Sequence, residues 1–257
     1  MGDNEFTVLG SSSGMPQTGR ACSGYALRVG DSVNLIDCGG GVTSAFLRCG
    51  FDPRTVRRVF ISHTHPDHCC DLPLFIQMIF LTGRKLDLDV YLPSEFVDPF
   101  ETALHGMYLY AGLFQFPLRL HGYEDGFEFT EDFHLTAIGN KHLRPYKEFI
   151  AAGGYSNRLQ CHSFRIEVDG CRPLLYSADI DSLEDIRPHV SGCGLVVMEL
   201  THVDFEQFAE MASGESGTRF VITHLGYPDA VEELKGRITR SGLVNVVLAE
   251  DGMMVEV

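Results

Sequence analysis

The chain has 257 residues, of which 44% are hydrophobic, so it is long enough to bury a sizeable core, and we expect one compact domain over residues 1–257. Its 20 Lys and Arg residues are outnumbered by 35 Asp and Glu residues, which gives a formal net charge of −15. This balance argues against a protein that holds long nucleic acids by their phosphates, because such binding needs Lys and Arg to displace counterions.

Short apolar runs bounded by Gly, Asp or Pro dominate the first 65 residues and predict strands. The runs are 6–9, 25–29, 33–36 and 56–62. A Gly/Ser-rich loop separates the first two, and a turn that begins at Asp37 and continues to Gly41 is expected to open a helix over 42–49.

The pattern changes to helical spacing between residues 72 and 115, where apolar side chains recur every three or four positions. We expect helices there on either side of a strand near 90–92. Further strands are predicted at 133–138, 163–168, 174–177, 195–200, 220–223 and 244–249, and further helices around 205–212 and 229–238. This order suits an α/β fold of two packed sheets with helices on their outer faces.

The cysteines and the start of the chain point to a reducing compartment. Eight cysteines are scattered without a CxxC pair, so a disulfide framework is not expected. The first ten residues lack a basic segment followed by an apolar one, and no run approaches the roughly 18 apolar residues of a membrane span. The sequence therefore predicts a cytoplasmic protein with reduced thiols and no membrane contact.

The most informative local pattern places four potential ligands within six positions after an apolar strand: His63, His65, Asp67 and His68. In an extended segment alternate side chains share a face, so the first three are expected to converge while His68 turns to the adjoining side. Imidazole with carboxylate suits zinc and related divalent ions, and the absence of thiolate partners argues against a closed structural zinc site. The alternative is a set of solvated or hydrogen-bonding loop histidines, but the density of the cluster favours two neighbouring metals.

The segment HTHPDH at 63–68 resembles the HxHxDH signature of the metallo-β-lactamase superfamily. The segment LGS at 9–11, with Pro16 and Arg20, and the segment NLIDCG at 34–39 resemble the opening of its ribonuclease Z-like branch and phosphodiesterase relatives. The strand VFIS at 59–62 is similar to the one that delivers the family's metal motif. The resemblance implies a four-layer αββα sandwich of two mixed β-sheets, built as a single hydrolase domain.

Three later residues fit the same family pattern, because each lies just after a predicted strand: His142, Asp179 and His224. An isolated His near a strand end is more often structural, but order, spacing and strand context together favour ligation. The resemblance implies two divalent metal ions. Zinc is the expected metal, and manganese or iron are the alternatives, since such sites accept the metal that is available. The resemblance divides the ligands as follows: His63, His65 and His142 hold one metal, Asp67, His68 and His224 the other, and Asp179 with a bridging hydroxide joins them.

The catalytic groups are less clearly marked than the ligands. Asp67 is a candidate to orient the attacking hydroxide or accept its proton. The segment VVMELTH at 196–202 resembles a ribonuclease Z segment that reads His-Glu-Ala-Thr, but Met198 stands where the family has its His. His202 is the candidate substitute as proton donor, and Glu199 the candidate support for Asp67 or a ligand His. For both residues a purely structural role in a hydrogen-bonded shell is the alternative.

The length of the chain between His142 and Asp179 indicates the size of the substrate. Ribonuclease Z enzymes commonly carry a long arm that grips transfer RNA, and here residues 143–178 leave no room for it. With the acidic charge, this favours a phosphodiesterase acting on a small or cyclic phosphodiester, and a large nucleic acid is not expected. The alternatives are hydrolysis of a carboxylic ester, lactone, thioester or sulfate ester, a ribonuclease Z-like nuclease acting on RNA ends, and a non-catalytic metal-binding or assembly protein. A homodimer is left open.

Overall fold

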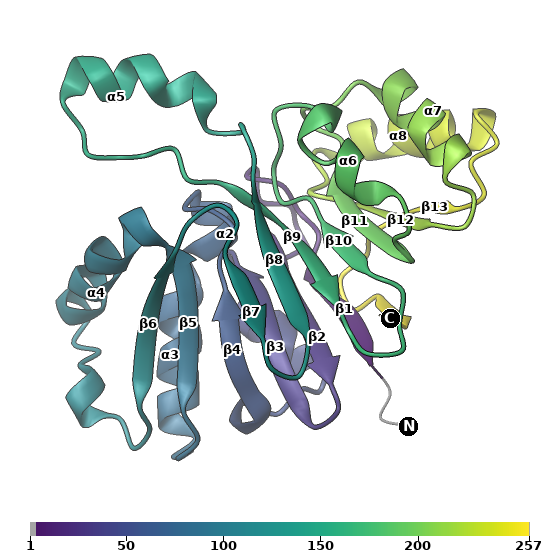
Figure 1. The fold of residues 1–257 in the computed structure, drawn as a ribbon. Coiled ribbons are helices and arrows are strands. Elements are labelled where there is room, and N and C mark those ends of the chain that lie inside the picture. Colours follow the sequence, from purple (N-terminus) through teal and green to yellow (C-terminus); the bar gives the residue numbers. More distant parts are fainter. Residues whose placement is uncertain (1–3, 257) are drawn as a thin grey trace.

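The computed structural model describes residues 4–256, whose strands form two seven-stranded sheets packed face to face (Figure 1). The first sheet has the order β14 (Met254–Glu256), β1 (Glu5–Gly10), β2 (Gly24–Val29), β3 (Ser32–Cys38), β4 (Val56–Phe60), β5 (Leu88–Pro93) and β6 (Leu118–Tyr123). The second has the order β13 (Val246–Leu248), β12 (Arg219–Thr223), β11 (Leu195–Glu199), β10 (Leu174–Tyr176), β9 (His162–Glu167), β8 (His134–Gly139) and β7 (Glu128–Thr130). Both are mixed, because β3 to β6 and β10 to β13 run parallel while the other pairs are antiparallel.

Helices cover the outer face of each sheet. The α-helices are α1 (Val42–Arg48), α2 (Pro66–Cys69), α3 (Leu72–Leu81), α4 (Val97–Gly106), α5 (Lys147–Gly153), α6 (Arg187–Val190), α7 (Phe205–Gly214) and α8 (Pro228–Arg240). Short 3₁₀ helices lie at Pro53–Thr55, Ser94–Phe96, Ala111–Leu113, Arg144–Tyr146 and Leu183–Asp185. Helices α1, α3 and α4 pack on the first sheet, and α6, α7 and α8 on the second.

The strands are apolar on both faces because each face meets a different core. Along β11, Leu195 and Val197 point into the core between the sheets, whereas Val196 and Met198 point into the core beneath α6, α7 and α8. Two-sided burial explains why the central strands read as continuous apolar runs rather than as an alternation. The four-layer arrangement predicted from the sequence is confirmed.

The sequence did not predict three strands (β6, β7 and β14) or three short helices (α2, α5 and α6). Strands β6, β7 and β14 all lie at sheet edges, where one side lacks a partner strand and the pattern of burial is weaker. Helix α5 lies in the interval expected to hold only a loop and two strands, and none of its residues is buried. Figure 1 shows α5 standing away from the sheets.

Within residues 4–256, none of the helices has the length and apolar character that a bilayer span requires.

Candidate metal centre

The structure gathers the seven predicted ligands at one edge of the sandwich, between the sheets. Each side chain lies in a segment that follows a strand: β4 in the first sheet, and β8, β10 and β12 in the second. The seven residues are His63, His65, Asp67, His68, His142, Asp179 and His224.

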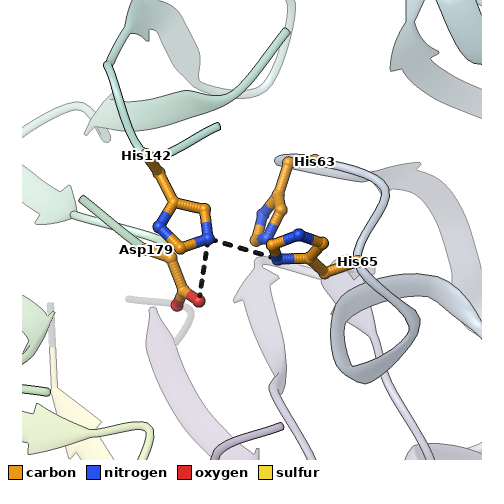
Figure 2. Close-up of side chains that lie close together, drawn as sticks. All are labelled: His63, His65, His142 and Asp179. Carbon is orange, nitrogen blue, oxygen red and sulfur yellow. Dashed lines mark hydrogen bonds and ion pairs between the residues drawn. The ribbon is translucent and has the colours of Figure 1, made fainter. Parts of the chain in front are cut away.

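The first half of the cluster consists of His63, His65, His142 and Asp179, which point toward one another (Figure 2). One ligand atom from each lies within 4.8 Å of the others. His65 Nδ1 is 3.2 Å from His142 Nε2, which is 3.6 Å from Asp179 Oδ2. Three imidazoles and one carboxylate therefore face a single point.

The second half consists of Asp67, His68, His224 and the same Asp179, again within 4.8 Å of one another. His224 Nε2 lies 3.2 Å from Asp67 Oδ2 and 3.3 Å from Asp179 Oδ2. His68 Nε2 lies 3.3 Å from Asp179 Oδ1. Because Asp179 belongs to both groups, the two form a continuous site with one carboxylate in the middle.

The local backbone differs in one respect from the predicted extended segment. The chain is extended only as far as His65, and Pro66 then begins the short helix α2. Proline suits the first position of a helix, because its fixed backbone angle is already helical and it has no amide hydrogen to leave unpaired. The turn places Asp67 and His68 on a helix, so both can face the second group.

Unpaired buried atoms show that these residues fit a pair of divalent metal ions. His63, His68 and Asp179 are 0%, 1% and 3% exposed. Among the described residues, none gives a hydrogen-bond partner to His63 Nε2, His68 Nε2 or Asp179 Oδ1. An unsatisfied buried polar atom costs about 1–3 kcal/mol, and cations bound within the two groups would satisfy all three of these atoms.

The ionisation of three cluster residues also suits a metal. Burial lowers the pKa of His63 well below its usual value and that of His142 to about 4, which keeps both rings neutral with lone pairs free. Burial favours a neutral Asp179, but the neighbouring His68 and His224 outweigh it and hold the pKa of Asp179 well below its usual range. Neutral imidazoles and an ionised carboxylate are the forms that bind cations. Burial also favours a neutral His68, but the charges of Asp179 and Asp37 outweigh it and raise the pKa of His68 well above its usual value, so this ring releases a proton when it binds a cation.

Asp37, which the sequence analysis did not select as a site residue, is fully buried and holds Ser62 and His68 in position by hydrogen bonds. Its Oδ1 accepts the Ser62 amide hydrogen at 2.7 Å. Its Oδ2 accepts from the Ser62 hydroxyl at 2.8 Å, and from His68 Nδ1 and the Tyr176 hydroxyl at 2.7 Å each. Holding Nδ1 of His68 leaves Nε2 directed into the site. The sequence did offer a signal for Asp37: it is an ionisable residue directly after the predicted apolar strand 33–36, where water cannot solvate its charge.

Replacing Asp37 is therefore expected to weaken metal binding. Asp37→Asn removes the charge that orients His68 and should lower zinc affinity by about 10- to 100-fold. Competition with a chromophoric chelator measures this, with the exposed Asp31→Asn as the matched control. Equal zinc affinity in the two variants would show that Asp37 does not position a ligand.

Backbone constraints concentrate around the same loops. Asp37, Ala178 and His224 have φ values of 56°, 50° and 55°, a region that costs a side-chain-bearing residue energy and clusters at functional sites. At Gly39, an added Cβ would lie 1.8 Å from the carbonyl oxygen of Asp67. Only glycine fits there, because a side chain would displace the turn that carries Asp67.

His202 and Glu199 form a pair at the mouth of the site. The His202 side chain is 40% exposed, its ring centroid lies 5.1 Å from that of His142, and its Nδ1 is 2.9 Å from Glu199 Oε1. Glu199 is fully buried and also accepts the amide hydrogens of Ile180 and His202. The hydrogen bond that His202 donates to Glu199 raises the pKa of His202. The structure thus pairs Glu199 with His202, rather than with Asp67 or a ligand His.

Met198 is fully buried in the core beneath α6, α7 and α8, so it points away from the metal cluster. It contributes packing there, and the imidazole nearest to the ligands that is not itself a predicted ligand is His202.

Comparison with known proteins places this site in a family context. A family model described as the metallo-beta-lactamase superfamily matches residues 17–143. Ribonuclease Z of Nostoc punctiforme is 29% identical over 172 residues, which cover 66% of this chain and 51% of the relative. Ribonuclease Z of Azobacteroides pseudotrichonymphae is 25% identical, with 98% of each chain covered. The chain therefore spans about half the length of the Nostoc relative.

Solved structures share the fold at low sequence identity. The metallo-beta-lactamase fold protein YhfI from Bacillus subtilis has a TM-score of 0.78 at 21% identity, with 100% of both chains covered. Human tRNase Z, short form, has a TM-score of 0.74 at 18% identity, with 98% of each chain covered. A diphosphatase from the PhnP family has a TM-score of 0.74 at 15% identity, with 99% of this chain and 98% of that chain covered.

Proposed function

Because residues 17–143 match the family model of the metallo-β-lactamase superfamily, we propose that this chain is a dinuclear metal-dependent hydrolase that cleaves a small or cyclic phosphodiester. The observation that carries the proposal is the pair of four-residue groups that share Asp179. Zinc is the proposed metal, since imidazole and carboxylate ligands suit it, and manganese or iron would fit the same donors.

When bound, divalent ions supply Lewis acidity, which lowers the pKa of water toward neutrality and stabilises negative charge on phosphoryl oxygens. The chain's own residues handle position and protons. Asp67 is ionised, because its hydrogen bond with His224 and the charge of His68 outweigh burial and lower its pKa. It can therefore accept a hydrogen bond from the attacking water and orient it. Beside His142, His202 donates a proton to the departing oxygen while Glu199 holds its ring.

The net charge of the chain and the short segment between β8 and β9 support a small substrate. The net charge of −15 disfavours long polyanions, and between β8 and β9 the chain adds only the short 3₁₀ helix at Arg144–Tyr146, the helix α5 and loops. The second candidate is a nuclease acting on RNA ends, which the named ribonuclease Z relatives favour. That candidate requires RNA affinity that falls steeply as salt rises, measurable by filter binding.

Three esters with a common chromophore test the reaction class. We expect zinc-loaded protein to hydrolyse bis(p-nitrophenyl) phosphate, to lose activity with a chelator, and to regain it with zinc. Parallel assays use p-nitrophenyl acetate and p-nitrophenyl sulfate. Turnover of either of these with none of the phosphodiester would replace the proposal with carboxylic or sulfate ester hydrolysis. Inertness toward all three, with zinc bound, would favour a metal-binding or assembly protein.

A further inference from the structure

A pocket of about 340 Å³ opens beside the metal centre, under the segment that carries α5. His65 forms part of its wall, and aromatic side chains of the α5 segment form another part: Tyr146, Phe149 and Tyr155. The Tyr146 ring links the pocket to the cluster, since its centroid lies 5.7 Å from that of His65 at an interplanar angle of 72°. A group in this pocket would therefore adjoin a phosphate at the metals.

The position of the Tyr155 ring is set by the backbone. Gly154 ends α5 in the left-handed region, with a φ of 64°, and reverses the chain so that the Tyr155 amide donates to the Ile150 carbonyl at 3.1 Å. The ring then lies directly on Gly153, where an added Cβ would come within 2.1 Å of Tyr155 Cε2. Any residue larger than glycine at 153 would push the ring away.

Both ends of the segment are anchored to the body of the protein. At the first end, the Leu143 side chain is only 7% exposed and forms part of the pocket. At the other end, Glu95 accepts the amide hydrogens of Arg158 and, at 2.9 Å, of Gln160. The rings between these anchors are thus held over the pocket by fixed ends.

The three aromatic side chains of the α5 segment are more exposed to solvent than aromatic residues usually are. Phe149 is 75% exposed, Tyr155 66% and Tyr146 48%, and α5 has no buried residue. A group of exposed aromatic side chains beside a concave site is typical of a binding surface. Asn157 and Thr64 add an amide and a hydroxyl to the pocket lining, which can pair with the polar edge of a heteroaromatic ring.

The charge of the segment complements a phosphate. Between residues 141 and 158 the chain has four Lys or Arg residues and one acidic residue, in a protein whose net charge is −15. The basic residues lie on the segment beside the pocket and not in its lining, where the carboxylate of Glu95 already accepts two amide hydrogens. The pocket itself offers stacking surfaces and hydrogen-bonding groups, as a nucleobase requires.

We propose that this pocket holds the nucleobase of a small nucleotide phosphodiester while its phosphate lies at the metal centre. The inference rests on the proposed function and narrows its substrate class. Tyr155 and Phe149 provide the stacking faces, and Tyr146 contacts His65 at the end of the pocket that adjoins the metal centre.

Two ligands that differ only in the base test this by calorimetry on the zinc-loaded protein. Adenosine 5′-monophosphate is expected to bind about tenfold or more tightly than ribose 5-phosphate. Tyr155→Ala and Phe149→Ala should each reduce that ratio severalfold, whereas Tyr155→Phe should keep it. Tyr108→Ala is the matched control, because Tyr108 is 80% exposed, at the end of α4, and is not in the pocket lining. Melting curves confirm that each variant is folded.

The outcomes separate this inference from the proposed reaction. Equal affinity for the two phosphates in the wild type, or an unchanged ratio in both alanine variants, would overturn the nucleobase pocket even if phosphodiesters are hydrolysed. A base-dependent ratio that both alanine variants reduce would support the pocket even if no phosphodiester is cleaved, in which case only the reaction is wrong.

Discussion

Asp179→Asn is expected to lower phosphodiester turnover by more than about a hundredfold, because the loss of a shared ligand should exceed the 10- to 100-fold effect typical of residues that only support ligands. Asp179 contacts both halves of the cluster, with Oδ1 3.3 Å from His68 Nε2 and Oδ2 3.3 Å from His224 Nε2. An amide keeps the shape but loses the charge and offers one oxygen instead of two. Bound zinc, measured by elemental analysis, should fall from about two ions per chain to about one or fewer.

The matched control for this substitution is Asp169→Asn, which changes an exposed carboxylate in a turn. It should retain both the metal content and the turnover of the wild type. If Asp179→Asn also retained two ions and full activity, Asp179 would not be the shared ligand.

His202→Ala is expected to produce a loss that depends on the leaving group. A cyclic nucleotide releases an alkoxide that needs a proton, so removal of the general acid should lower its kcat by about a hundredfold or more. The p-nitrophenolate of bis(p-nitrophenyl) phosphate leaves without protonation, so its hydrolysis should fall much less. Steady-state kinetics on the two substrates give the comparison directly.

Two variants sharpen the test of His202. Glu199→Gln keeps a hydrogen-bonding group but removes the charge that holds the imidazole. It should therefore also lower kcat more for the cyclic nucleotide than for bis(p-nitrophenyl) phosphate, but by a smaller factor than His202→Ala does. His105→Ala, an exposed His on α4, should leave both rates near wild type. If His202→Ala lowered kcat equally on both substrates, His202 would not be the proton donor and would have only a structural role.

The parts of the fold that the sequence predicted are those with a strong local signal. Strands apolar on both faces, such as β11 and β12, stand out as short runs bounded by turn residues, and they form the centre of the second sheet. Strands β6, β7 and β14 lack this signal, because at these sheet edges several of their side chains are exposed and break the apolar run. The prediction of one domain over residues 1–257 stays a prediction, as do the cytoplasmic location and the homodimer.

The site shows the same division between local and distant information. The candidate ligands could be found because four lie within six positions and the other three follow predicted strands. Asp37 and Tyr176 are 139 positions apart along the chain and meet only in the folded protein, so no local pattern marks their contact. The pocket under α5 depends on the reversal at Gly154 and on Glu95 anchoring a distant loop, which spacing alone does not reveal.

A crystal structure of the zinc-loaded protein, with anomalous scattering recorded at the zinc edge, tests the central claim most directly. We expect two zinc peaks about 3.5–4 Å apart, one among His63, His65 and His142 and the other among Asp67, His68 and His224, with Asp179 contacting both. A map with no zinc peak between these side chains, or with zinc bound only elsewhere on the protein, would contradict it.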